Sequence, residues 1–339
     1  MKNLPVISAL ALVFLGAASA ASAMPVGDPA PIRLAELADL SLEQLANVTV
    51  TSASRHEERA IEAPASIFVL TAEDIRRSGA TSLPELLRLA PNLQVIRGDT
   101  SQYIVSARGG LSGTANKMLV LVDGRTIYTP LFSGVFYDAQ VLMLEDLERV
   151  EVISGPGSTL WGTNAVNGVI NIVTKPAART QGALLAAGAG DMEKGVSARA
   201  GAPFTDGHYR VYGRYFERAA HERAGGLTAF DQAERWQAGF RADWERGGRT
   251  TTVQGDLYGA KVDNLGGARD MAGGNLLGRW RIPTGADGDV MVQAFYDRTE
   301  REHEGSFREK RDTFDVEVQR SLRRARHEMV LGAGYRAST

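Results

Sequence analysis

The chain has 339 residues, with 38 basic and 40 acidic side chains and no cysteine. This near balance of charge excludes a bulk electrostatic attraction to nucleic acid or to an anionic membrane surface. The lack of cysteine excludes disulfides, thiolate metal sites and a cysteine nucleophile.

The first residues have the pattern of an export signal. Lys2 gives a basic start, an apolar run follows from Val6 to Ala18, and Ala21-Ser22-Ala23 has the form of a cleavage site. We therefore predict a Sec-type signal peptide over residues 1–23. A single membrane-spanning helix is the alternative, but the run is shorter than the roughly 20 residues that such a helix needs. No later segment qualifies, so a membrane protein with this sequence must be a β-barrel.

The next segments alternate between strand and helix patterns. Ile67 to Leu70 is a β-branched strand, and Thr71 with Asp74 three residues later is typical of a capping box for a helix that runs to Arg77. Ser82 begins a second helix, which ends before Pro91. Further strands are expected at Met118–Val122, Leu147–Ile153 and Gly168–Thr174.

After Pro176 the pattern changes to strict alternation. Between Trp236 and Trp244 every second residue is apolar or small, and the residues between them are mostly polar. Similar segments recur, so that we expect about nine strands of roughly 10 residues between Ala183 and Arg336, apolar outward and polar inward. A soluble β-sandwich also alternates and stays an alternative, but aromatic residues at strand ends favour an outer-membrane barrel.

Four motifs of the first part carry a family resemblance. They are Val105-Ser106-Ala107-Arg108-Gly109-Gly110, the run Met118 to Arg125, the run Leu147 to Gly162, and Ala165 to Lys175. In residues, order and spacing, this set resembles the plug of TonB-dependent receptors. Asn167 departs from the family, which often has glycine there, and Asn tolerates positive φ better than most residues.

The resemblance implies an α+β plug domain followed by antiparallel transmembrane β-barrel strands, about nine of about 22. The implied domains are a signal peptide at 1–23, a leader with a TonB-box-like segment at 24–58, a plug domain at 59–176 and a partial outer-membrane β-barrel at 177–339. The 163 residues after Pro176 are fewer than the roughly 220 that 22 such strands need. We therefore expect the chain to be an N-terminal fragment of a longer receptor, a truncated product or one piece of a split receptor.

Catalytic patterns are missing. No phosphate-binding glycine loop is present, no G-x-S-x-G surrounds Ser112 or Ser158, and the five histidines lack metal-ligand spacing. We predict no enzyme activity, no catalytic residue, no metal site and no cofactor.

Three sets of site residues follow from the resemblance. Val48, Thr49, Val50 and Thr51 are similar to a TonB box, a segment that adds a strand to a partner's sheet; an ordinary first plug strand is the alternative. Plug charges in this family pair with the barrel wall, and the candidates are Arg108, Glu148, Arg149 and Glu151, with Arg108 expected to be buried. Solvated strand ends are the alternative for Glu148 and Arg149.

Aromatic residues in plug loops are candidates for a ligand-binding apex. They are Tyr103, Tyr128, Phe132, Phe136 and Tyr137, whose exposed rings would stack on a planar ligand. Packing against the barrel wall explains the aromatics of the Tyr128–Tyr137 loop equally well.

The resemblance implies TonB-dependent active import of a scarce nutrient, such as a ferric siderophore, cobalamin or a saccharide, across the outer membrane of a Gram-negative cell. The implied partners are the TonB energy-coupling protein, a small-molecule or metal-chelate ligand and outer-membrane lipid, with no nucleic acid. The alternative function is a soluble periplasmic plug-type binding module without transport activity.

Overall fold

The structure, a computed structural model, describes residues 49–50, 58–59, 65–109, 114–285, 288–324 and 327–339. The predicted signal peptide and most of the predicted leader, including Val48 and Thr51 of the TonB-box candidate, lie outside the described residues. Two short strands, β1 (Thr49–Val50) and β2 (Glu58–Arg59), pair antiparallel within the leader.

The first folded unit, called the plug below, mixes short helices with two small sheets. Its larger sheet has the strand order β3-β8-β9-β6-β7, in which only the β6–β9 pair is parallel. Its elements are β3 (Ser66–Thr71), α3 (Ala72–Arg77), α4 (Leu83–Leu87), β4 (Gln94–Arg97), β5 (Tyr103–Ser106), β6 (Met118–Val122), β7 (Arg125–Thr126), η3 (Tyr137–Ala139), η4 (Leu144–Asp146), β8 (Leu147–Ser154), α5 (Ser158–Trp161) and β9 (Gly168–Thr174).

The strands and helices predicted for this unit are confirmed. Thr71 and Asp74 form a capping box at the start of α3, because each satisfies a backbone N–H that the first helical turn leaves unpaired. Ser82 precedes α4 as expected, but its side chain makes no capping hydrogen bond. The leucines of α4 belong to one cluster of buried apolar side chains together with residues of β8 and β9, so the plug has an apolar interior of its own.

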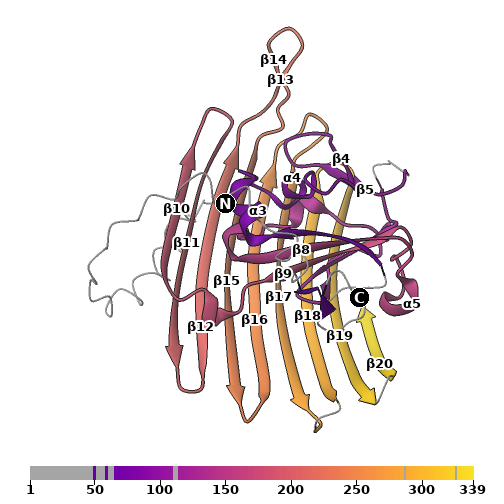
Figure 1. Cartoon of the computed structure of the whole chain (residues 1–339). Coiled ribbons are helices and arrows are strands. Elements are labelled where there is room, and N and C mark those ends of the chain that lie inside the picture. Colours follow the sequence, from indigo (N-terminus) through magenta and orange to yellow (C-terminus); the bar gives the residue numbers. More distant parts are fainter. Residues whose placement is uncertain (1–48, 51–57, 60–64, 110–113, 286–287, 325–326) are drawn as a thin grey trace, which may run out of the picture.

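A short connection, η5 (Ala177–Arg179), leads to a nine-stranded sheet, called the wall below. Every neighbouring pair is antiparallel, in the order β10-β11-β12-β15-β16-β17-β18-β19-β20. The strands are β10 (Gly182–Ala189), β11 (Glu193–Phe204), β12 (Gly207–Arg218), β15 (Ala233–Arg246), β16 (Arg249–Val262), β17 (Arg269–Pro283), β18 (Gly288–His303), β19 (Phe307–Arg324) and β20 (His327–Ser338). A small hairpin, β13 (Glu222–Arg223) with β14 (Leu227–Thr228), projects between β12 and β15 (Figure 1).

The sequence alternation becomes two chemically different faces of the wall. On β15, Trp236 and Trp244 lie on the outward face, eight residues apart, which is about 26 Å along a strand. That spacing resembles the roughly 25 Å apolar band of outer-membrane barrels, which aromatic girdles flank. The return to β16 uses Gly247-Gly248, both with positive φ, as a two-residue hairpin turn requires.

The plug lies against the inward face of the wall (Figure 1). Among the described residues, β10 and β20 are the two edges of the sheet and do not pair with each other, so the barrel is not closed. No helix within the described part of the chain is long and apolar enough to span a membrane. The predicted fold class, an α+β plug followed by antiparallel barrel strands, is confirmed.

Candidate functional site

The candidate site is the interface between plug and wall, where inward side chains of the wall meet plug loops. Arginines dominate the wall side: Arg210 and Arg218 of β12 are among the largest fully buried side chains of the described residues. Among the described residues, contacts between plug and wall form three clusters. The linker cluster is Asp146, Lys175, Arg199 and Arg210; the turn cluster is Asp123, Gly124, Arg241, Gln254, Arg279 and Gln293; the apical cluster is Asp99, Asp138, Arg269 and Arg301.

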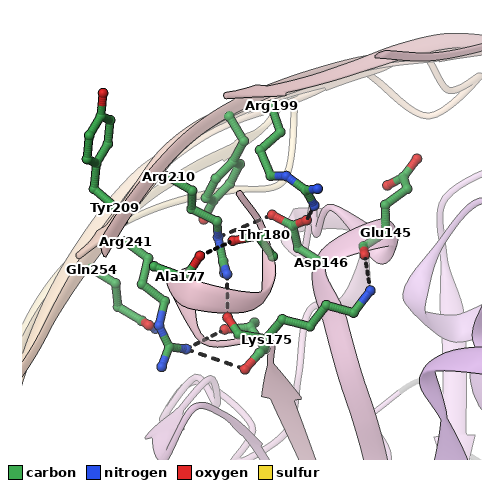
Figure 2. Close-up of polar contacts among 12 residues, drawn as sticks. Glu145, Asp146, Lys175, Ala177, Thr180, Arg199, Tyr209, Arg210, Arg241 and Gln254 are labelled. Carbon is green, nitrogen blue, oxygen red and sulfur yellow. Dashed lines mark hydrogen bonds and ion pairs between the residues drawn. The ribbon is translucent and has the colours of Figure 1, made fainter. Parts of the chain in front are cut away.

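The linker cluster lies where the chain leaves the plug (Figure 2). Asp146, at the end of η4, is buried between two wall arginines: Arg199 donates to its Oδ1, and the Nε of Arg210 lies 3.2 Å from its Oδ2. Arg210 also donates to the backbone carbonyl of Lys175. One plug carboxylate thus holds two neighbouring wall strands, β11 and β12.

Lys175 fixes the other side of this cluster. Its ammonium donates to the carbonyl of Glu145 at 2.8 Å, and its backbone N–H donates to the carbonyl of Asp146. Burial, and then the nearby arginines, lower the pKa of Lys175 despite the opposing effect of Asp146. One residue beyond Pro176, the N–H of Ala177 donates to Asp243 of β15 at 2.7 Å, so the connection is held to the wall as well.

The turn cluster is built on the two-residue hairpin Asp123-Gly124 between β6 and β7. Both residues have positive φ, which this turn demands and which glycine adopts without strain. A Cβ on Gly124 would also lie 2.9 Å from Nη2 of Arg279. A larger residue at position 124 would therefore displace the ends of the Arg279 and Gln293 side chains.

Wall side chains bind both residues of this turn. Arg279 donates to the carbonyl of Asp123, and Gln293 donates to the carbonyl of Gly124 at 3.2 Å. Gln254 donates to the Asp123 carboxylate at 2.9 Å, which also accepts the N–H and hydroxyl of Thr174. Burial by itself would raise the pKa of Asp123, but Arg241, the Thr174 N–H and Gln254 outweigh it and lower that pKa. The carboxylate is held in its charged form.

The apical cluster lies toward the end of the wall that carries the β13–β14 hairpin. Asp138 of η3 accepts hydrogen bonds from Nη1 and Nη2 of Arg301, at 2.9 and 2.6 Å, and lies 3.4 Å from Arg269. Arg269 also binds Asp99 of the β4–β5 hairpin at 2.5 Å. The guanidinium of Arg301 lies over the ring of Phe136, 3.9 Å from its centre.

The charges of this cluster are almost completely removed from water. Burial would raise the pKa of Asp138, but Arg301 above all, together with Arg269 and Arg235, lowers it. Arg235 is buried nearby, and two of its guanidinium nitrogens have no hydrogen-bond partner among the described residues. The cluster therefore depends on Asp138 as its central negative charge.

Residues 59–169 match the family model described as "TonB-dependent Receptor Plug Domain". Residues 59–169 are thus a plug domain of the TonB-dependent receptor type. The vitamin B12 transporter BtuB of Vibrio cholerae is 33% identical over 146 residues, which cover 42% of this chain and 23% of that protein. An iron-regulated outer membrane virulence protein of the same species is 34% identical over 132 residues, or 37% of this chain and 20% of the relative.

Solved structures of receptors share the fold of plug and wall together. The copper transporter OprC aligns with a TM-score of 0.65 at 17% identity, over 80% of this chain and 46% of that one. FpvA of Pseudomonas aeruginosa, solved bound to heterologous pyoverdines, aligns with a TM-score of 0.64 at 15% identity, over 88% and 45%. The chain thus spans less than half of these receptors and under a quarter of the curated relatives that it matches.

The four plug residues that were predicted to pair with the wall do not make ion pairs with it among the described contacts. Glu148 pairs with Arg149 and with Arg179 of η5 at 2.7 Å, and Arg149 pairs with the buried Glu151 at 2.6 Å. These described pairs lie inside the plug and its connection. Arg108 was expected to be buried, and this is wrong: its side chain is exposed and makes no ion pair with the described strands. Wall pairing by these four residues stays a prediction.

The TonB-box candidate is described only in its centre. Thr49 and Val50 form β1, and Val50 is fully buried. A role in binding TonB stays a prediction.

The predicted ligand apex is partly corrected. Tyr103 and Tyr137 are buried in the plug core and not exposed; the hydroxyl of Tyr103 donates to Glu85 at 2.7 Å and accepts from Arg218. Tyr128, Phe132 and Phe136 are half-buried. Phe136 stacks edge-to-face on Phe132 and lies beneath Arg301, so the alternative of packing against the wall describes Phe136 well. Ligand contact by these three rings stays a prediction.

The aspartates that do contact the wall were missed from the sequence. Asp123, Asp138 and Asp146 stand at turns or short helices, where an acidic residue is commonplace. The sequence does contain a signal for the wall side of these contacts. Arginine recurs at every fourth position on the inward face of β12, at Arg210, Arg214 and Arg218. No cluster of three metal-ligating side chains occurs among the described residues.

Proposed function

We propose that the chain forms the plug and part of the wall of an outer-membrane importer driven by the TonB energy-coupling protein. The observation that carries the proposal is that a TonB-dependent receptor plug domain packs by buried charges on the polar face of a sheet whose other face is apolar. A polar lumen and an apolar exterior are the arrangement of outer-membrane barrels. The function is transport, without covalent chemistry.

The loops give the proposed orientation. Residues 219–232, between β12 and β15, carry the β13–β14 hairpin, while the opposite end of β15 turns in two residues. Outer-membrane barrels place longer loops outside the cell and short turns in the periplasm. The apical cluster then lies toward the cell exterior, and β1 with the TonB-box candidate enters from the periplasm.

The proposed ligand is a scarce nutrient in the range of the relatives. The relatives include a vitamin B12 transporter, and the structural neighbours include siderophore receptors and a copper transporter. A ferric siderophore or cobalamin is therefore the first class to test, with a saccharide as the further candidate.

The buried ion pairs between plug and wall fit a plug that is held in place at rest and moves during import. Buried ion pairs contribute little net stability over apolar packing but are strongly destabilising when only one partner is removed. An interface of such pairs fixes the plug in one position. When the whole plug shifts and water enters, both partners regain solvation together, so the barrier to movement is lower than for an apolar interface of equal area.

Outer-membrane fractionation of the tagged chain, with heat-modifiable gel mobility, tests the location. We expect the chain in the outer-membrane fraction. Recovery as soluble, folded periplasmic protein would contradict the proposal and favour the alternative, a plug-type binding module, which the plug's own apolar core would permit.

Disulfide crosslinking tests the partner. Because the chain has no cysteine, Thr49→Cys introduces a single thiol in β1, and a second is placed in the C-terminal domain of TonB. We expect crosslinking at Thr49 and none with the control Thr205→Cys, an exposed position in the β11–β12 turn, which lies at the same end of the wall as the two-residue β15–β16 turn. Equal crosslinking at both positions would contradict a specific TonB box.

A further inference from the structure

At the tip of the β4–β5 hairpin, two plug residues are buried at the interface with the wall. Thr100 and Ser101 are both 0% exposed, although they form the turn of a hairpin. Asp99 shapes the turn, because its Oδ1 accepts the backbone N–H groups of Ser101 at 2.7 Å and Gln102 at 2.6 Å. Its Oδ2 binds Arg269 of the apical cluster.

Every polar group of Thr100 is bound by the wall side. Its N–H donates to Oδ2 of Asp231 at 3.0 Å, and its hydroxyl donates to the carbonyl of Asp231. Its own carbonyl accepts from Nη1 of Arg218 at 2.6 Å. Because buried polar groups without partners are costly, the tip of the plug hairpin is firmly held by these two residues.

Asp231 also closes the base of the projecting β13–β14 hairpin. Its Oδ1 accepts the N–H of His221 at 2.8 Å, and its Oδ2 lies 2.8 Å from Nδ1 of the same histidine. The carbonyl of His221 in turn accepts the N–H of Ala229. One buried carboxylate therefore joins both sides of the projecting hairpin to the plug tip.

The far end of the projecting hairpin is open to solvent. It stands beyond the ends of the wall strands (Figure 1), turns through Gly225-Gly226, and leaves Leu227 68% exposed. A force applied to this end would reach the plug through few contacts. These are the two paired strands of the hairpin, the His221–Asp231 contact and the hydrogen bonds between Asp231 and Thr100.

We propose that Asp231 is a positioning residue that couples the β13–β14 hairpin to the tip of the plug, so that occupancy of the hairpin is transmitted to Thr100. The role of this coupling in import rests on the proposed function, in which the hairpin faces the cell exterior. The coupling itself is a property of the folded chain and is tested apart from location and transport.

The test uses a single engineered thiol. In the Leu227→Cys chain, biotin maleimide labels the hairpin end, and streptavidin serves as the load. Amide hydrogen exchange of the segment containing Thr100 is measured in detergent with and without streptavidin, in the Leu227→Cys chain and after a further Asp231→Asn change. Ser306→Cys, exposed in the β18–β19 turn at the same end of the wall, is the matched control for labelling.

We expect streptavidin at position 227 to change exchange at Thr100 by roughly threefold or more, since exchange reports local opening. The effect should vanish with Asp231→Asn and should be absent for the label at position 306. No change in the Leu227→Cys chain, or a change that persists in Asp231→Asn, would overturn the proposal.

If the Asp231→Asn variant does not fold, a second variant still tests the proposal. Thr100→Val removes only the hydroxyl that binds Asp231 and keeps the backbone contacts, so it should weaken the response without abolishing it; an undiminished response would contradict the coupling. If the chain were absent from the outer membrane but streptavidin still changed hydrogen exchange at Thr100, the proposed function would be contradicted and the coupling would be supported.

Discussion

The two faces of the wall are made by alternate residues of the same strands, yet they meet opposite surroundings. On β12 and β15 the inward Arg210, Arg218 and Arg235 are buried against the plug, while outward side chains such as Phe240 are exposed. Leu257 and Trp280, on neighbouring strands, are 62% and 58% exposed. The polar residues are thus inside and the large apolar residues outside, the reverse of a soluble sheet packed on an apolar core.

This inversion is the arrangement expected of a wall that separates two kinds of medium. A sheet that buries arginines and exposes leucine and tryptophan is stable only where its exterior is apolar and its interior supplies counter-charges. The plug supplies them through Asp138, Asp146 and the Asp123 turn.

On the inward face, Asp138→Ala should be the most damaging change. It leaves Arg269 and Arg301 buried without their shared carboxylate, and breaking one side of a buried ion pair costs about 3–5 kcal/mol. The check is the free energy of unfolding in urea, measured for the chain in detergent micelles. Asp270→Ala, an exposed aspartate of β17, is the matched control and should leave that free energy within about 0.5 kcal/mol. Equal effects of the two changes would refute the central role of Asp138.

On the outward face, Leu257→Arg should destabilise the chain in a bilayer by roughly 2–4 kcal/mol, the cost of a cation near the membrane midplane. Leu227→Arg is the control, because Leu227 is equally exposed but lies on the projecting hairpin. Stability is compared by denaturant titration of the two variants in lipid vesicles. A similar small effect at both positions would indicate that Leu257 faces water.

Acid should weaken the inward contacts more gently than substitution does. The pKa of Asp138 and that of Asp123 are lowered from 3.8 in the folded chain, so the unfolded chain binds more protons in that range and stability rises with pH. The contribution is fully present above about pH 5 and is lost as pH falls through the folded pKa values, below 3.8. A protonated carboxyl still makes hydrogen bonds, so the loss should be smaller than for Asp138→Ala.

Urea midpoints between pH 3 and pH 7 give the measurement. In the Asp138→Asn variant, the urea midpoint should fall less between pH 5 and pH 3 than it does in the unsubstituted chain. An equal fall of the urea midpoint in both chains would mean that other carboxylates govern stability in acid.

The smallest effect is expected away from both faces, at the plug surface. Hydrogen bonds from Arg76 and Arg77 lower the pKa of Glu73 to about 2, but the carboxylate is exposed at the surface. Solvent and salt screen such exposed pairs, so Glu73→Gln should leave the urea midpoint at pH 7 unchanged. A clear shift would show that surface charges, and not only buried ones, hold the plug together.

The sequence predicts the elements well because their signals are local. Alternation over ten or more residues indicates a strand whatever lies next to it, and Thr71 with Asp74 is a capping signal within one helical turn. Met118–Val122 and Gly168–Thr174 occur in the structure with the predicted bounds. The inward arginines of β12 could likewise be placed on the polar face from alternation alone.

The partners of those arginines could not be predicted, because pairing depends on where distant loops meet. Nothing near Asp138 in the sequence distinguishes it from a solvated loop aspartate, and Arg301, which binds it, comes 163 residues later. Tyr103 was misplaced for the same reason: a tyrosine beside a turn suggests exposure, whereas the fold turns its ring into the core. The coupling role of Asp231 depends on three segments that only the fold brings together.

Quenching of tryptophan fluorescence by brominated lipids tests the two-faced wall most directly. The chain has four tryptophans, and single-tryptophan variants that keep either Trp280, exposed on the outward face, or Trp161, packed in the plug, are reconstituted into vesicles. We predict strong quenching of Trp280 and little of Trp161. Equal quenching of both, or quenching of neither, would contradict a wall with lipid outside and the plug within.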